Sequence, residues 1–201
     1  MKTGILGGTF NPVHMGHLIL AENARDQLQL DRVLFIPSGV SYLKDQSEIV
    51  PAADRIAMVR LAIDGNPFFE LSTLETDKSG NSYTCETLRE LHEENPSDEL
   101  YFIGGADILM SIHTWKDPDR ILKLATLVIA PRNFTEKDEL EYHKSFLRES
   151  YEANVIFLDT FNLEISSSTI RERIRNNHSI RYYVPDSVES YIEEHQLYIR
   201  D

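Results

Sequence analysis

Cysteine is almost absent, because the 201 residues contain only Cys85. A single cysteine cannot form a disulfide within the chain or a cysteine-based metal site, so we expect Cys85 to be a small apolar residue packed in a helix. Long apolar runs are also missing, and none approaches the roughly 20 residues that a membrane-spanning helix needs. The N-terminus runs directly into a Gly-rich turn and does not resemble a secretory signal. These absences predict a soluble, cytoplasmic protein that does not bind membranes.

Basic residues are scarce. The chain has 20 Lys and Arg against 33 Asp and Glu, which gives a formal net charge of −13. Phosphate polymers are bound through basic surfaces, so this balance argues against DNA or RNA as a partner. It does not exclude a nucleotide, because a small anion needs only a local cluster of donors and a divalent cation can neutralise part of its charge.

The chain has no fixed-period repeats and no low-complexity tracts. Short apolar runs alternate with helical periodicity from one end to the other, a rhythm typical of parallel sheets covered by helices. We expect strands at residues 2–6, 32–37, 68–72, 100–104, 126–130 and 154–158. We expect helices at residues 18–28, 54–64, 84–94, 136–150, 169–175 and 187–194. The sequence therefore predicts one α/β domain over residues 1–201, with a doubly wound parallel sheet in a three-layer α/β/α arrangement.

Ligands of doubly wound sheets bind at the carboxyl ends of the strands, near the point where the strand order reverses. The segments that directly follow the predicted strands are therefore the candidates for a binding site. These are residues 7–17, 37–44, 104–107 and 131–132.

The segment 7–17 is the most informative part of the sequence. Gly7 and Gly8 allow a sharp turn and a close approach of backbone amides to a phosphate, and Thr9 adds a hydroxyl. His14 and His17 can share one side of a helix that begins there, whose N-terminus favours anionic oxygens. The spacing fits neither a Walker A loop nor the G-x-G-x-x-G fingerprint. A histidine that only caps the helix is the plainer alternative.

A second candidate segment, residues 165–171, begins a helix near the C-terminus. Ser166 or Ser167 can serve as its N-cap. The serine hydroxyls and amides, with Arg171 one turn further on, suit a pyrophosphate leaving group. Taken alone, this pattern also fits simple capping with surface arginines.

Together these segments resemble the two signatures of the HxGH nucleotidyltransferase superfamily, G-G-T-F-x-P-x-H-x-G-H and I-S-S-T-x-I-R. Ser168 stands where the second signature usually has Thr, which keeps the hydroxyl. The resemblance implies a Rossmann-like nucleotidyltransferase fold in which His14, His17 and Arg171 are catalytic. It implies that C-terminal helices from about residue 166 complete an ATP site. ATP contacts are then expected from Gly7, Gly8, Thr9, Phe10, Gly16, Gly104, Asp107, Arg132, Ser167 and Ser168.

The middle of the chain carries candidates for the second substrate. Tyr83 and Thr84 precede a predicted helix, so the amides there and the Thr84 hydroxyl could hold a small anion. Asp107 follows a strand and could accept hydrogen bonds from ribose hydroxyls. Trp115, the only tryptophan, could stack on a base, and a core position is an equal alternative.

These elements, with the C-terminal Val184-Pro185 and Tyr191-Ile192 pairs, resemble the bacterial nicotinate mononucleotide adenylyltransferases over nearly the whole chain. The resemblance implies that ATP and nicotinate mononucleotide give nicotinate adenine dinucleotide and pyrophosphate in NAD biosynthesis. Mg²⁺ is expected to arrive with ATP, without a dedicated protein site for the metal, and a homo-oligomer is possible. Nicotinate mononucleotide would be held by Lys44, Tyr83, Thr84 and Trp115.

One departure leaves the acceptor open. The family often has P-P-H-K after its second strand, whereas this chain has Ser41-Tyr42-Leu43-Lys44. A preference for nicotinamide mononucleotide is therefore one alternative. Another HxGH enzyme, such as phosphopantetheine adenylyltransferase or a cytidylyltransferase, is a second. A nucleotide sensor without catalysis is a third, against which His14, His17 and Arg171 argue.

Overall fold

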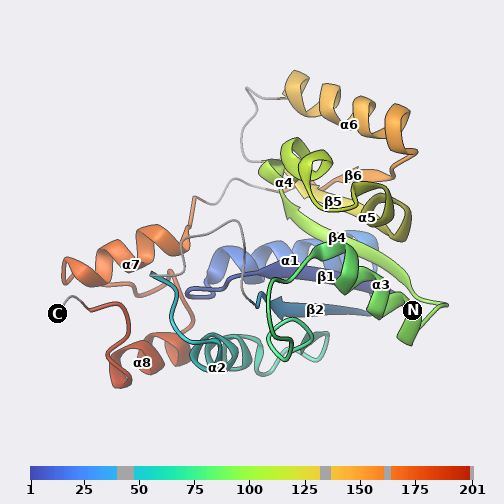
Figure 1. Ribbon diagram of the computed structural model, residues 1–201. Coiled ribbons are helices and arrows are strands. Elements are labelled where there is room, and N and C mark those ends of the chain that lie inside the picture. The colour runs from blue at the N-terminus through green and yellow to red at the C-terminus, as the bar shows by residue number, and fades with distance from the viewer. Residues whose placement is uncertain (40–47, 132–136, 161–163, 200–201) are drawn as a thin grey trace.

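Six parallel strands form a single sheet in the order β3-β2-β1-β4-β5-β6 (Figure 1). The computed structural model describes residues 1–39, 48–131, 137–160 and 164–199. All six predicted strands are present, with ends that shift by one or two residues. Their bounds are β1 Lys2–Gly8, β2 Arg32–Pro37, β3 Phe69–Leu71, β4 Glu99–Gly105, β5 Ala125–Ala130 and β6 Val155–Phe157.

The predicted helices are also confirmed. They are α1 Met15–Leu28, α2 Ala52–Ile63, α3 Thr84–Glu94, α6 Lys137–Tyr151, α7 Ser167–Arg175 and α8 Asp186–Glu194. Sequence periodicity missed the helical turns between β4 and β5, because elements this short repeat their apolar positions too few times to show a period. These are α4 Ala106–Ser111, the 3₁₀ turn η2 Ile112–Thr114 and α5 Pro118–Leu124. None of the described helices is both long and apolar enough to cross a membrane.

Each strand sends alternate side chains to opposite faces of the sheet, which makes two cores. In β2, Val33 and Phe35 belong to the core beneath α1, α2, α7 and α8, and Leu34 and Ile36 to the core beneath α3, α4, α5 and α6. Cys85 is buried in the second core, as expected for an apolar residue of α3. In Figure 1, α2 and α8 lie together beside β2, and α4, α5 and α6 gather around β5 and β6. The predicted three-layer α/β/α arrangement is confirmed.

The strand order reverses between β1 and β4. From β1 the chain builds outward through β2 to β3, then returns to place β4 on the other side of β1. The crossover connections therefore leave the ends of β1 and β4 in opposite directions, and a crevice opens at their carboxyl ends. Gly8 ends β1 and Gly105 ends β4, so the fold places both Gly-Gly pairs at this crevice.

Candidate active site

A cleft of about 630 Å³ lies at the carboxyl ends of β1, β4 and β5 and extends to the start of α7. Its walls come from segments that are far apart in the sequence, as the two signatures require. Predicted site residues that line it are Gly7, Gly8, Thr9, Phe10, His14, Gly16, His17, Gly104, Asp107, Ser167, Ser168 and Arg171. The structure thus brings together most of the residues assigned to ATP and catalysis, while the role of each stays a prediction.

The two histidine rings are stacked at the N-terminus of α1. Their centroids are 3.6 Å apart with an interplanar angle of 28°. His14 is the N-cap, and its backbone N–H donates to Nδ1 of His17 at 3.2 Å. A neutral imidazole whose Nδ1 accepts carries its proton on Nε2, so this bond makes Nε2 of His17 a hydrogen-bond donor. A group that donates near a helix N-terminus is suited to an anionic oxygen.

Gly16 sets the space around His14. A Cβ at this position would lie 3.1 Å from Nδ1 of His14 and 3.6 Å from the Cβ of Ile165. A side chain would therefore press on the His14 ring, while its contact with Ile165 would be an ordinary one. Gly16 contributes by leaving room, which explains its place between the two histidines.

Phe10 lines the cleft, but its side chain is only 2% exposed. The ring meets His17 edge-on at 5.0 Å between centroids and packs on Phe35 at 5.9 Å. The backbone of Phe10 has φ of 49°, in the left-handed region, which is uncommon for an aromatic residue. Predicted as an ATP contact, Phe10 is seen in the structure as a buried support for the His17 ring.

Asn11 joins the two signatures, and sequence reasoning missed it. Its side-chain Nδ2 donates to the carbonyl of Glu48 at 2.9 Å, and its Oδ1 accepts from the hydroxyl of Tyr198 at 3.0 Å. Arg171 Nη1 donates to the Asn11 carbonyl at 3.0 Å, and Ser167 Oγ donates to the Pro12 carbonyl at 2.9 Å. The only signal in the sequence was the place of Asn11 inside the first motif.

The start of α7 follows the predicted capping pattern. Ser166 is the N-cap, and its side chain accepts from the backbone N–H of Thr169 at 3.1 Å. Ile170 is fully buried beneath the helix, and Arg171 and Arg175 share another face. The Ser167 hydroxyl and the Arg171 side chain reach the loop that follows β1, whereas the Ser166 and Ser168 hydroxyls lie 2.9 Å from each other.

Glu48 is a second residue that sequence reasoning missed, because an isolated acidic residue in a loop gives no pattern. Its carboxylate lies 3.1 Å from Nη2 of Arg171 and 3.1 Å from Nη2 of Arg175. The hydrogen bonds from Arg171 and then Arg175 lower the pKa of the Glu48 carboxyl. A carboxylate thus lies where two arginines, one helical turn apart, could instead hold the oxygens of a polyphosphate.

Gly104 and Asp107 lie across the cleft from the histidines. Gly104 is near the end of β4, and Asp107 is an exposed residue in the first turn of α4. The position of Asp107 fits the predicted hydrogen bonds to ribose hydroxyls.

Three residues assigned to the second substrate, Tyr83, Thr84 and Trp115, lie on the face of the sheet that α3 and α4 cover. Tyr83 and Trp115 pack against the core beneath α3 and α4. The Trp115 ring meets Phe102 edge-on at 6.2 Å, and Phe102 comes within 3.9 Å of where a Cβ on Gly7 would lie. Within the described chain, Tyr83, Thr84 and Trp115 are not among the residues that line the cleft. Trp115 is half-buried against this core, and its stacking on a base stays a prediction.

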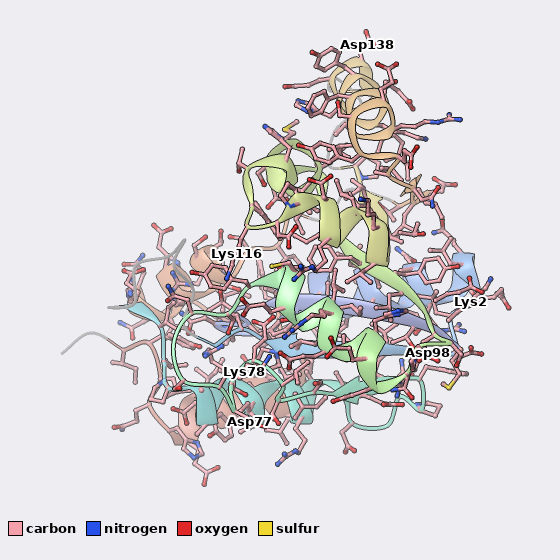
Figure 2. All side chains as sticks on the ribbon, turned by 45° about the vertical axis from the view of Figure 1, so that its right-hand side comes forward. Lys2, Asp77, Lys78, Asp98, Lys116 and Asp138 are labelled. Atoms are coloured by element: carbon pink, nitrogen blue, oxygen red, sulfur yellow. The ribbon has the colours of Figure 1, made fainter. Side chains whose placement is uncertain are left out.

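Lys116 contacts both Tyr83 and Glu86. Its Nζ lies 3.8 Å from the centroid of the Tyr83 ring and 2.7 Å from Oε1 of Glu86 in α3. Figure 2 labels Lys116 near the start of this helix. The hydrogen bond to Glu86 raises the pKa of Lys116, so the residue keeps its positive charge beside Tyr83.

A half-buried carboxylate, that of Glu75, anchors the loop that leads into α3. Thr87 Oγ1 donates to Glu75 at 2.8 Å, and the backbone N–H of Gly39 donates to the same carboxylate. Burial raises the pKa of Glu75, and these hydrogen bonds oppose that rise. A Cβ at Gly39 would lie only 2.5 Å from the Glu75 carbonyl and from Oγ of Ser82, so the end of β2 can approach this loop only with glycine.

Two predicted residues lie outside the described part of the chain. Lys44, assigned to the second substrate, falls between residues 39 and 48, and Arg132, assigned to ATP, falls between residues 131 and 137. The departure at Ser41-Tyr42-Leu43-Lys44 lies in the same gap as Lys44.

Fold and cleft together define a nucleotidyltransferase of the doubly wound α/β class, with stacked histidines at one wall and a serine-arginine helix start at the other. The sequence profile of the cytidylyltransferase-like family matches residues 5–173, and the chain belongs to this family.

Curated relatives match over their full length. A Dehalococcoides mccartyi protein named "Probable nicotinate-nucleotide adenylyltransferase" is 44% identical, with 100% of this chain and 98% of the relative covered. A Lachnoclostridium phytofermentans protein of the same name is 40% identical, with 98% and 99% covered. Among solved structures, a Plasmodium falciparum nicotinic acid mononucleotide adenylyltransferase complexed with NaAD has a TM-score of 0.79 at 19% identity, covering 98% of each chain. That structural likeness confirms the fold.

Proposed function

We propose that this protein is a nicotinate-nucleotide adenylyltransferase, which transfers AMP from ATP to nicotinate mononucleotide and releases pyrophosphate. The observation that carries the proposal is the pairing of His14 and His17 with Arg171 across one cleft. The names of the relatives support the choice of acceptor. Such an enzyme works in the cytoplasm on small molecules, and assembly into a homo-oligomer stays a prediction from the resemblance.

The reaction is a direct displacement at the α-phosphorus of ATP. An oxygen of the acceptor's phosphate forms the new bond to this phosphorus, and the bond to the β-phosphate oxygen breaks, so that its electron pair leaves with pyrophosphate. No covalent enzyme intermediate is needed. Catalysis then depends on alignment and on donors that meet charge as it develops on the phosphoryl oxygens.

His17 is assigned to the oxygens of the reacting phosphate. The hydrogen bond from the His14 backbone to Nδ1 leaves Nε2–H to donate, and Phe10 supports the ring from behind. The donor is therefore oriented before ATP binds, so little reorganisation is needed in the transition state. His14, stacked on His17 at the helix N-terminus, is assigned to the neighbouring phosphate oxygens.

The leaving pyrophosphate is assigned to the start of α7. Ser167, Ser168 and Arg171 line the cleft, and the guanidinium is held within reach by the Asn11 carbonyl. Binding of the β- and γ-phosphates there would exchange the Glu48 carboxylate for phosphate oxygens on Arg171. The C-terminal helices from Ser166 onward would thereby complete the ATP site.

The acceptor is assigned to the side of β1 that carries Tyr83, Thr84 and Trp115. The half-buried Trp115 ring offers a flat surface for the pyridine ring, and Lys116 brings positive charge beside Tyr83. Lys116 is ion-paired with Glu86, so the choice of the acid nucleotide over the amide rests on the names of the relatives.

Mg²⁺ fits a site of this kind as a partner of ATP. The carboxylates that line the cleft are Asp107 and Glu48, and Glu48 is bound to two arginines. Mg²⁺ commonly uses one or two carboxylates together with phosphate oxygens and waters, so phosphate oxygens would supply most ligands here. When bound, the ion neutralises charge on the phosphates.

The test is pyrophosphate release by the purified protein with ATP and Mg²⁺, comparing nicotinate and nicotinamide mononucleotides. We expect a kcat/KM at least about tenfold higher for the acid, from one additional charged contact. A reversed preference would keep adenylyl transfer and make the amide the acceptor, and an equal preference would keep adenylyl transfer without discrimination between the two. No release with either nucleotide, but release with phosphopantetheine or with CTP in place of ATP, would overturn the proposal.

A further inference from the structure

Arg55, in α2, is a buried cation that the proposed chemistry does not use. The residue is only 3% exposed, and it lies behind the loops that follow β1 and β2. Its Nη1 donates to the carbonyl of Thr9 at 2.9 Å and to the carbonyl of Ser38 at 2.8 Å, and its Nε donates to the carbonyl of Val50 at 3.3 Å. Thr9 itself lines the cleft.

All three acceptors are neutral carbonyls. In the described part of the chain, no carboxylate lies within ion-pairing distance of the Arg55 guanidinium, although acidic residues outnumber basic ones by 33 to 20. Burial lowers the pKa of Arg55, but an arginine starts so far above neutrality that it stays charged. A buried charge normally has a counter-ion, because an unpaired one is expensive to desolvate.

The position of the charge indicates what its counter-ion is. The guanidinium binds the carbonyls of Thr9 and Ser38, and each of these residues directly follows a strand end at the carboxyl edge of the sheet. Thr9 also lines the cleft, so the cation is hydrogen-bonded to a residue of the cleft wall. At such a place the field is screened less than at the surface.

We propose that Arg55 is an electrostatic positioning residue for the triphosphate, and that the anionic substrate acts as a counter-ion for its charge. The inference rests on the proposed function only in taking ATP as the ligand of the cleft. It also accounts for how a chain of net charge −13 attracts a polyanion, because a fixed positive charge behind the binding loop is screened less by salt than a charge at the surface.

The alternative is a structural role, in which Arg55 only joins the loops. The two roles predict different dependence on ligand charge. A charge effect weakens ATP and inorganic tripolyphosphate far more than AMP, whereas a distorted loop weakens every ligand of the cleft alike. A lysine at position 55 also distinguishes the two roles, because it keeps the charge but cannot form the three hydrogen bonds of the guanidinium.

The experiment is calorimetric titration of ATP, tripolyphosphate and AMP into the wild type and the variants R55M and R55K at low ionic strength. We expect R55M to bind ATP and tripolyphosphate about tenfold more weakly and AMP less than about threefold more weakly. We expect R55K to bind ATP within about threefold of the wild type. R60M is the matched control, because Arg60 lies on the same helix but is exposed, and we expect its affinities within about 1.5-fold.

Equal losses for ATP and AMP in R55M would overturn the inference, and so would an effect of R60M as large as that of R55M. If R55M does not fold, the R55K variant provides the test. R55K keeps the charge, so a loss of ATP affinity of tenfold or more would show that the hydrogen bonds matter and the charge does not. Binding of ATP and AMP needs no acceptor. A protein that fails to adenylylate nicotinate mononucleotide but shows the charge dependence would therefore refute the proposed function alone.

Discussion

The two halves of the proposed site are built differently. On the ATP side, hydrogen bonds tie the loop after β1 to α7, through Arg171 to Asn11 and Ser167 to Pro12. On the acceptor side, aromatic rings pack on the core beneath α3 and α4, and Lys44 lies outside the described residues. The first half is a preformed polar frame suited to a reaction common to many enzymes. The second is a packed apolar surface, where a change of side chain can alter the acceptor without disturbing the chemistry.

The largest effect that would test this contrast is expected from H17A. Removing a donor that acts mainly in the transition state should lower kcat by roughly 10² or more, with a much smaller change in ATP affinity. Steady-state kinetics and calorimetry measure the two separately. H195A is the control, because His195 is exposed and stacked on Tyr191 away from the cleft. A defect confined to KM would contradict the assignment.

The second effect concerns the start of α7. We expect R171M to lower kcat/KM for ATP by about 10- to 100-fold, since a charge-assisted bond to the leaving group is lost. The matched control is R173M, on the same helix, because Arg173 donates to the Ser179 carbonyl and lies over the Tyr183 ring. If both variants lose activity equally, damage to α7 explains the result, and the hydrogen bonds between α7 and the loop after β1 have no special role in catalysis.

The third effect belongs to the acceptor side. We expect W115A to raise KM for nicotinate mononucleotide by about tenfold, because a base loses its stacking surface, while KM for ATP changes less than twofold. Fluorescence of Trp115 in the wild type should fall when the acceptor binds. An equal rise of both KM values would mean that the two halves are not separable.

The smallest effect concerns Glu48. Because its pKa is lowered in the folded protein, its contribution to stability is present above the ordinary value of 4.5 and is lost as the pH falls through the lowered value. We expect E48Q to flatten the pH dependence of unfolding in that acid range, measured by urea titration. At neutral pH, E48Q should bind ATP about two- to threefold more tightly, because Arg171 no longer has a competing anion. Weaker ATP binding would instead make Glu48 part of the site.

Sequence periodicity found every strand and the longer helices, because each carries several apolar positions. It missed α4 and α5, which are too short to show a period. The motifs identified His14, His17 and Arg171 because their chemistry fixes their spacing. Asn11, Glu48 and Arg55 escaped because their roles come from partners distant in the chain, such as Arg175 for Glu48 and Ser38 for Arg55. A single sequence shows which residues are present, but it does not show which distant residues contact one another in the fold.

The hydrogen bonds of the loop after β1 also bear on when the protein can first act. Pro12 and Asn11 form hydrogen bonds with Ser167 and Tyr198, which lie 155 and 187 residues further along the chain. Synthesis proceeds from the N-terminus, and contacts between distant residues form slowly. A growing chain can thus assemble much of its sheet on the ribosome while its phosphate site is still incomplete. If α7 completes the ATP site as proposed, we expect fragments that end before it to show no adenylyl transfer.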